Sequence, residues 1–234
     1  MAKPKSRWRW PRRILISLFL ILLGYHAWIA AHIWWWVDHN PASSAFMESS
    51  LETLHEKNPR AALQQRWLAY ANISDNLKRA LIAAEDASFV DHEGFDWDGI
   101  ALAYEKNMKK GKIVAGGSTI SQQLSKNLFL STKRTPWRKA EEAVITVMLE
   151  RIMDKRRIFE IYLNVIEWGN GVFGAEAAAQ HYYGVSAALL TPEQAARMAA
   201  MVPNPRFYDR HRETPGLARK TAIILENMER AETP

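Results

Sequence analysis

Three short polar segments carry the residue types that acid–base and phosphate chemistry require. In the first, Glu85 and Asp86 end a stretch of apolar residues at helical spacing and precede Phe89 and His92. A carboxylate can take the proton of an attacking hydroxyl group, so this segment could supply a general base. The two acidic residues could equally be a solvated helix end, and the roles of Asp86 and His92 could be structural.

The second segment combines small residues, amides and a cation at the start of an expected helix. Free backbone N–H groups at a helix start can receive an anion. Gln122, Gln123 and Lys126 lie near one face of such a helix, because residues three and four apart are neighbours. The alternative is an ordinary polar helix face. The polar and small residues of this segment are Gly117, Ser118, Thr119, Gln122, Gln123, Lys126 and Asn127.

The third segment is a basic patch followed by two acidic residues. Arg134, Arg138 and Lys139 precede Glu141 and Glu142. Arg138 and Glu142 are spaced for an ion pair on one helix face, which on a surface contributes little to stability. Each of the three segments is a weak signal when it is taken alone.

Several other chemistries are excluded because their motifs are incomplete. Gly117 stands where a phosphate-binding P-loop requires Lys, and Pro59 stands where a zinc protease would need a second His after His55. Lys220-Thr221-Ala222 is a near miss of the Lys-Thr-Gly element of penicillin-recognising transpeptidases, and their Ser-x-x-Lys element is absent. The chain has no cysteine, which excludes disulfides and thiolate catalysis.

Charge and length exclude a nucleic-acid-binding domain and bound the size of the fold. The 234 residues include 31 Lys plus Arg and 25 Asp plus Glu, a formal net charge of +6. All of this excess precedes residue 14, so the remaining chain is balanced. A domain that binds DNA or RNA is expected to keep a basic excess in its folded part. The length suits one domain and an appendage.

The appendage is predicted to be a membrane anchor. Residues 14–37 contain no charged side chain and exceed the roughly 20 residues that cross a bilayer. Tryptophans flank this run, and the basic residues lie in the segment 1–13 before it. The positive-inside rule therefore places the N-terminus in the cytoplasm and the rest of the chain on the far side of the membrane. The alternative, a cleaved signal peptide, usually has a shorter apolar core.

The elements that must position the three segments are mostly helices. Residues 38–50 are predicted to be a polar tether, and 51–234 to be one mostly α domain. Helix-start signals are found at Ser74, Thr119 and Thr191, which are expected to be N-cap residues. A Gln stands three residues after Thr119 and three residues after Thr191, as in a capping box. Apolar residues at helical spacing run from Ile158 to Val165, and a last helix is expected from about Leu217 to Arg230.

Taken together, the polar segments resemble one family of enzymes. The motifs are EDASFVDHEG (85–94), GGSTISQQLSKN (116–127), RKAEE (138–142) and KRRIFEIYLN (155–164). In this order and spacing they resemble glycosyltransferase family 51, and most closely its monofunctional branch of peptidoglycan transglycosylases. The resemblance implies a lysozyme-like α domain in the periplasm. It also implies a transferase that polymerises lipid II with inversion, releases undecaprenyl pyrophosphate and has no transpeptidase activity.

The resemblance also implies roles for individual residues. Glu85 is then the general base, and Glu142 is a second essential glutamate that orients cations or a divalent ion. Lys126, Arg134 and Arg138 are expected at the departing pyrophosphate, with Gln123 and Ser118 as positioning groups. The supporting residues are expected to be Asp86, Phe89, His92, Gly117, Thr119, Gln122, Asn127, Lys139 and Asn164. Family members often use Mg²⁺ or Mn²⁺, but no ligand set is visible in the sequence.

The expected partners are lipid II, the nascent glycan chain, the inner membrane and other proteins of cell-wall synthesis and division. Glu141 departs from the family pattern, because some relatives carry a basic residue there. Two other classes stay open: a membrane-anchored muramidase that cleaves finished glycan, and a non-catalytic scaffold of the cell envelope. The basic groups favour the transferase, because glycan cleavage expels a sugar hydroxyl and no pyrophosphate.

Overall fold

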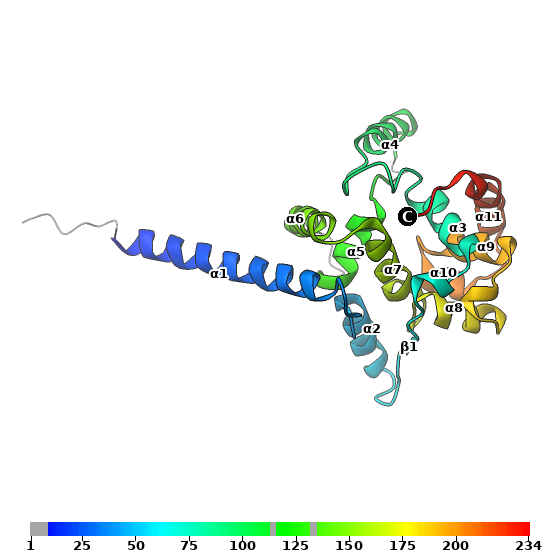
Figure 1. The fold of residues 1–234 in the computed structure, drawn as a ribbon, viewed down its shortest axis with the longest axis horizontal. Helices are drawn as coiled ribbons and strands as arrows, with labels where there is room; N and C mark the ends of the chain where they lie inside the picture. Colours follow the sequence, from blue (N-terminus) through cyan, green and yellow to red (C-terminus); the bar gives the residue numbers. More distant parts are fainter. Residues whose placement is uncertain (1–8, 113–115, 132–134) are drawn as a thin grey trace, which may run out of the picture.

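The computed structural model describes residues 9–112, 116–131 and 135–234. Its longest described helix is α1 (Arg9–Trp35). The N-terminal part of this helix projects away from the other elements in Figure 1. The stretch Trp10–Trp35 has a mean hydropathy of 2.1 and is the one described helix long and apolar enough to cross a membrane. Leu15 and Ile21 are about two-thirds exposed, as suits side chains that face lipid. The prediction of an N-terminal membrane-spanning helix is confirmed.

The last turns of α1 pack against the remainder of the chain. Ile29 and Ile33 are fully buried there. The hydroxyl of Tyr25 donates to Oε1 of Glu141 over 2.6 Å, and Nε of Arg157 donates to the carbonyl oxygen of Trp36 over 2.8 Å. The membrane helix is therefore fastened to the domain by apolar contacts and by hydrogen bonds.

The predicted tether differs from the structure in its second half. Residues 45–50 begin helix α2 (Ala45–His55), in which Met47 and Ser50 are buried. The side chain of Ser44 caps this helix by accepting from the N–H of Met47. The serine-rich composition that indicates a linker thus includes the start signal of a packed helix.

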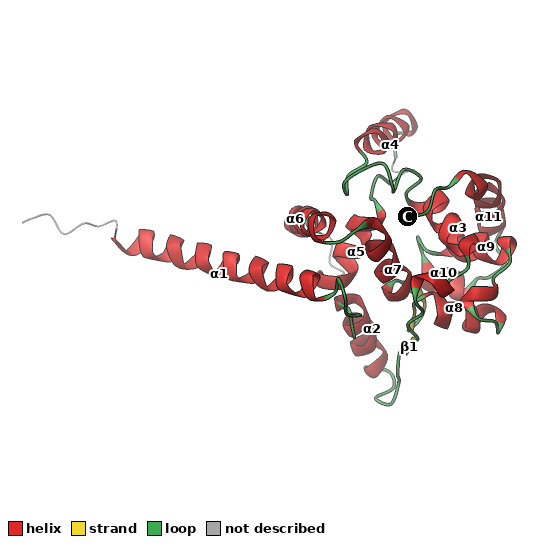
Figure 2. Ribbon diagram, in the orientation of Figure 1, coloured by secondary structure: helices red, strands yellow, loops and turns green. Residues whose placement is uncertain are grey.

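Most of the remaining regular structure is helical, with loops between the helices, as Figure 2 shows. The longer ones are α3 (Asp75–Glu85), α4 (Trp97–Lys110), α5 (Ile120–Phe129), α6 (Pro136–Ile152), α7 (Lys155–Val165), α8 (Ala175–Tyr183), α9 (Pro192–Met201), α10 (Pro205–Arg210) and α11 (Pro215–Asn227). Short 3₁₀ turns lie at η1 (Tyr70–Asn72), η2 (Ala187–Leu189) and η3 (Met228–Arg230). The prediction of a mostly α domain is confirmed.

Side-chain caps fix where the site helices begin. Ser74 caps α3, and Thr119 with Gln122 forms a full capping box at the start of α5. Thr135 caps α6 by accepting from the N–H of Arg138. Asp96 caps α4, a helix that the sequence analysis did not predict. These caps satisfy N–H groups that a helix start leaves without partners, and so set the registers of the site residues.

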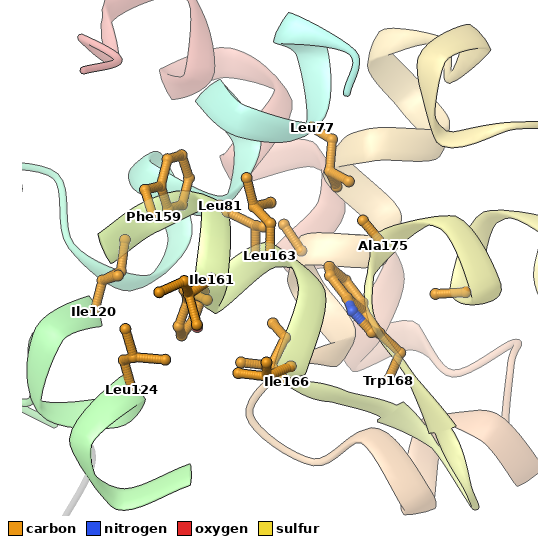
Figure 3. Close-up of a cluster of buried hydrophobic side chains, with 14 of the residues drawn as sticks. Leu77, Leu81, Ile120, Leu124, Phe159, Ile161, Leu163, Ile166, Trp168 and Ala175 are labelled. Atoms are coloured by element: carbon orange, nitrogen blue, oxygen red, sulfur yellow. The ribbon is translucent and has the colours of Figure 1, made fainter. Parts of the chain in front are cut away.

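One buried core joins the helices that carry the polar segments. Figure 3 shows Leu77 and Leu81 of α3, Leu124 of α5 and Ile161 of α7, with Trp168 nearby, and all five are fully buried. Close packing gives such a core little freedom to rearrange. The polar residues on the same helices are therefore held at fixed positions.

A small sheet lies beside this core. Its strands β1 (Gln64–Gln65), β2 (Glu167–Gly169) and β3 (Val172–Phe173) have the order β1-β3-β2. β1 pairs in parallel with β3, with Gln64 opposite Val172, and β2 pairs antiparallel with β3. The sheet places Glu167 next to the cleft described below.

Candidate active site

Glu85 is the last residue of α3 and lies at the end of a small cavity. Its Oε2 accepts a hydrogen bond of 2.6 Å from Nε2 of Gln123 on α5. The cavity has a volume of about 230 Å³ and is formed by α3, α9 and α11 with the turn after α9. Its lining residues are Ala83, Ala84, Glu85, Ala199, Ala200, Pro203, Lys220, Ile223 and Ile224.

The surroundings of Glu85 raise its pKa above that of an ordinary glutamate. Burial is the main cause, because the charged form loses its water. The hydrogen bond from Gln123 and the positive charges of Lys126 and Lys220 act in the opposite direction, and the negative charge of Asp86 adds to the rise. A carboxylate of this kind is a stronger base than one in water.

Gln123 is itself held by two further contacts. Its Oε1 accepts a hydrogen bond of 3.1 Å from the hydroxyl of Tyr162 on α7. Its backbone oxygen accepts from Nδ2 of Asn127 over 2.7 Å. The amide that faces Glu85 is therefore connected to the buried core.

A second cavity lies on the other side of Gln123. It measures about 190 Å³, and Gln123, Lys126, Asn127 and Glu167 contribute its polar lining together with Phe46 of α2. Pro203 borders both cavities, so they are neighbours. The ammonium group of Lys126 lies 5.4 Å from the centre of the Phe46 ring. We refer to these two neighbouring cavities together as the cleft: Glu85 lines the first cavity, and Lys126 lines the second.

Lys126 belongs to a cluster of positive charges near Glu142. Burial lowers the pKa of Lys126, Glu142 raises it again, and the charges of Arg138 and Lys139 lower it further. Because three cations surround one glutamate, the cluster keeps a positive excess. Such a cluster can attract a multiply charged anion and stabilise charge that develops on it.

Glu142 is buried and uses both carboxylate oxygens to hold cations. Its Oε2 accepts from Nη1 of Arg138 over 3.0 Å, and its Oε1 contacts the ammonium group of Lys139. Lys139 also reaches Oγ of Ser118 at 3.5 Å. Nε of Arg138 is buried and has no hydrogen-bond partner among the described residues. Such a donor is suited to a ligand that brings its own acceptor atoms.

Asp86 and His92 link two segments of backbone instead of facing the cleft. Oδ1 of Asp86 lies 2.9 Å from Nε2 of His92, and Oδ2 accepts from the N–H of Ile120 over 2.9 Å. Nδ1 of His92 accepts from the N–H of Gly94, so the ring proton is on Nε2 and is donated to Asp86. Asp86 thus fixes the first turn of α5.

The other predicted residues support the site from different places. Thr119 and Gln122 cap α5, so the side chain of Gln122 is turned away from Gln123 and Lys126. A Cβ atom at Gly117 would lie 3.2 Å from the Cα of Ile100, so this position favours glycine. Phe89 is in the core, and Asn164 is fully buried with hydrogen bonds to the backbone of Leu68. Arg134 lies outside the described residues.

The sequence analysis missed several residues of the cleft, among them Phe46 and Glu167 of the second cavity, and Tyr162 and Lys220 near Glu85. Tyr162 was assigned to an apolar helix face, and Lys220 was named as part of a failed transpeptidase motif. Tyr162 follows Ile158 at helical spacing and has no signal of its own. Lys220 comes from α11, far away in the sequence. Glu141 is bound to Tyr25 of the membrane helix, so its charge is directed to α1.

Among the residues that the structure describes, the side chains do not fit a resident metal site. No group of three or more His, Asp or Glu that could hold a metal occurs within residues 9–112, 116–131 and 135–234. Glu142 has both oxygens engaged by cations, and Glu85 accepts from an amide. An Mg²⁺ or Mn²⁺ ion would need its ligands from a substrate and from water.

Comparison with known proteins identifies relatives that span nearly the whole chain. The family described as transglycosylase matches residues 51–229. A biosynthetic peptidoglycan transglycosylase of Methylobacillus flagellatus is 70% identical, covering 95% of this chain and 97% of that protein. Proteins of the same name from Chromobacterium violaceum and Nitrosospira multiformis are 64% and 62% identical, over 95% and 98% of this chain and 97% and 99% of their own lengths.

Proposed function

The chain belongs to the transglycosylase family and is a peptidoglycan glycosyltransferase that polymerises glycan from lipid II, and we propose that Glu85 and the Lys126–Glu142 cluster divide the reaction between them. The observation that carries this proposal is the cleft itself. Glu85, a carboxylate of raised pKa, lines one cavity, and Lys126, which feels the charges of Glu142, Arg138 and Lys139, lines the other. The two cavities match the two charges that the transfer must handle.

Glu85 acts as the general base. The 4-hydroxyl of the incoming sugar attacks the anomeric carbon of the growing chain, and its proton passes to Glu85 as the new carbon–oxygen bond forms. The bond between the anomeric carbon and the pyrophosphate breaks on the opposite side. This displacement inverts the anomeric centre, so an α-linked donor gives a β-1,4-linked glycan.

The cation cluster stabilises the leaving group. Undecaprenyl pyrophosphate gains negative charge as the bond breaks, and preorganised cations stabilise that charge without having to move. Lys126 and Arg138 carry this role in the described cleft, and we assign Arg134 to the same role from its position in the sequence. Glu142 orients Arg138 and Lys139 and transfers no proton, because both its oxygens are already engaged.

The remaining partners follow from this chemistry. The growing glycan chain is the donor, and a divalent ion such as Mg²⁺ or Mn²⁺ enters as a companion of the substrate pyrophosphate. Contacts with other cell-wall synthesis and division proteins are a separate proposal that rests on the shared substrate.

We also propose that the N-terminus is cytoplasmic and that the domain after α1 is periplasmic. The support is the basic segment before the membrane helix. Because the chain has no native cysteine, Lys109→Cys on the exposed face of α4 gives a single reporter site. A membrane-impermeant maleimide should label this variant in cells with a permeabilised outer membrane, and protection until the inner membrane is lysed would reverse the orientation.

The decisive experiment is a gel assay of glycan length. Purified full-length protein is incubated with lipid II in detergent or vesicles, and finished glycan is offered in a parallel reaction. We expect chains to lengthen from lipid II and finished glycan to stay intact. Shortening of the polymer would indicate a muramidase. Unchanged lipid II would point to a scaffold.

A further inference from the structure

The hydroxyl of Tyr162 is placed to control which way the Gln123 amide faces. An amide side chain has a donor end and an acceptor end of almost the same shape. Only the donor end stabilises an ionised carboxylate. In this structure the donor end contacts Glu85 at 2.6 Å, and the acceptor end receives the Tyr162 hydroxyl at 3.1 Å.

Tyr162 is suited to be a permanent donor. Its side chain is fully buried, and burial together with the charges of Glu85 and Asp86 raises its pKa well above that of a free tyrosine. The hydroxyl therefore keeps its proton at every pH at which the enzyme would work. A buried hydroxyl must find an acceptor, and Oε1 of Gln123 is that acceptor.

The alternative orientation of the amide is disfavoured at both ends. Turning the amide over would place its oxygen against the carboxylate of Glu85, where two acceptors repel each other. It would also place the NH₂ group against the Tyr162 hydroxyl, which would then have to find another acceptor. The chain of donors from Tyr162 through Gln123 to Glu85 therefore favours the ionised form of Glu85.

We propose that Tyr162 is a positioning residue of the transfer reaction: its hydroxyl fixes the Gln123 amide with the NH₂ group toward Glu85 and so keeps the base ready to accept a proton. This inference rests on the proposed role of Glu85. Tyr162 touches no substrate and acts through Gln123.

The test compares Tyr162→Phe with Tyr182→Phe. Each removes one hydroxyl that is hydrogen-bonded inside the protein, since Tyr182 donates to the carbonyl oxygen of Trp168 over 2.7 Å, away from Glu85. Lipid II polymerisation is measured from acidic to alkaline pH for both variants and for wild type. For Tyr162→Phe we expect the acidic limb of the kcat profile to move upward by about one pH unit, because the Gln123 amide can then turn over and lose its hydrogen bond to the charged Glu85, and such a loss changes an equilibrium by about tenfold. KM should stay near the wild-type value, and Tyr182→Phe should keep the wild-type limb.

A double-mutant cycle shows whether Tyr162 acts through the amide. Gln123→Met removes the amide at similar length and should move the acidic limb in the same direction. Adding Tyr162→Phe to Gln123→Met should move it no further. An additional shift of full size would overturn the inference. An unchanged limb in Tyr162→Phe would overturn it as well, as would loss of a cooperative thermal transition in that variant.

Failure of this inference can be told from failure of the proposed function. If Glu85→Gln still polymerises lipid II, Glu85 is not the base, and the limb belongs to another group. If Glu85→Gln is inactive while Tyr162→Phe keeps the wild-type limb, the base assignment stands and only the positioning role of Tyr162 is wrong.

Discussion

The two glutamates that we assign to the reaction, Glu85 and Glu142, have the same side chain but opposite surroundings. Glu85 accepts from a neutral amide and borders a cavity lined mainly by alanine, isoleucine and proline. Glu142 is buried, and its carboxylate holds Arg138 and Lys139. Burial raises the pKa of Glu85 and makes its carboxylate more ready to take a proton, whereas the carboxylate of Glu142 holds two cations in place.

This difference explains how one residue type can serve two steps of a reaction. In the division of roles that we propose, Glu85 handles a proton, and Glu142 with its cations handles phosphate charge. Lys126 lies between them and is influenced by both glutamates. The predictions below test this division of roles, beginning with the largest expected effect.

The first prediction removes the basicity of Glu85 and keeps its shape. Glu85→Gln should lower turnover by about a thousandfold, within the range of general base catalysis. Binding of lipid II should survive, because the cation cluster is untouched. Chain elongation on gels and a binding assay with labelled lipid II measure the two effects separately. Elongation at the wild-type rate would show that Glu85 is not the base, and the proposed difference in role between Glu85 and Glu142 would be wrong.

The second prediction concerns Lys126, the cation that lines the second cavity. Lys126→Ala should lower turnover by about a hundredfold, the effect of removing one preorganised group that stabilises developing charge. Lys109→Ala, an exposed cation on α4, is the matched control and should keep full activity. Circular dichroism should show the same helix content for both variants. Loss of helix in Lys126→Ala alone would mean that this lysine is a structural residue.

The third prediction separates the second glutamate from the first. Glu142→Gln frees Arg138 and Lys139 from their fixed positions, so the cluster loses its order. A phosphoglycolipid inhibitor that mimics the donor should bind about tenfold more weakly, as expected when one hydrogen-bonded ion pair is lost. Glu85→Gln should bind the same inhibitor normally. Equal binding by both variants would count against a donor-side role for Glu142.

The fourth prediction uses the raised pKa of Glu85 as a property of the folded state. Because this pKa is higher in the folded than in the unfolded protein, the folded state holds the proton more tightly. Its contribution to stability is full below the unfolded pKa and is lost as the pH rises through the folded pKa. Glu85→Gln should therefore melt a few degrees above wild type at pH 8, and this gap should close as the pH falls.

The matched control for this melting experiment is Glu105→Gln on the exposed face of α4. Its melting temperature should follow the wild type at every pH. A constant difference between Glu85→Gln and wild type from pH 4 to pH 8 would show that the substitution acts through packing and not through charge.

Local signals in the sequence predicted the helix starts well and missed what depends on tertiary contact. Thr119 with Gln122 and Thr191 with Gln194 form the capping boxes that the sequence indicates. The predicted end of the chain, a helix from Leu217 to Arg230, corresponds to α11 and η3. Caps depend on neighbours within one turn, so a pattern of four residues is enough.

The side-chain contacts around the cleft could not be predicted from local sequence patterns. Asp96 had no role in the sequence analysis, but it caps α4. Asp86 was left open between two roles, and its contact with the N–H of Ile120 joins residues 34 positions apart. Lys220 reaches the cavity of Glu85 from the last long helix. No local pattern encodes such distances, because the buried core brings these side chains together.

Because α1 packs against the domain, the orientation of the domain at the membrane depends on the thickness of the bilayer. A helix from Trp10 to Trp35 has 26 residues and is about 39 Å long, which is longer than a typical hydrocarbon layer. Such a helix adjusts to a thinner or thicker membrane by tilting. Because Ile29, Ile33 and Arg157 fasten its last turns to the domain, a change of tilt turns the whole domain with it. Lipid composition would then set the angle at which the cleft meets the lipid-linked sugars.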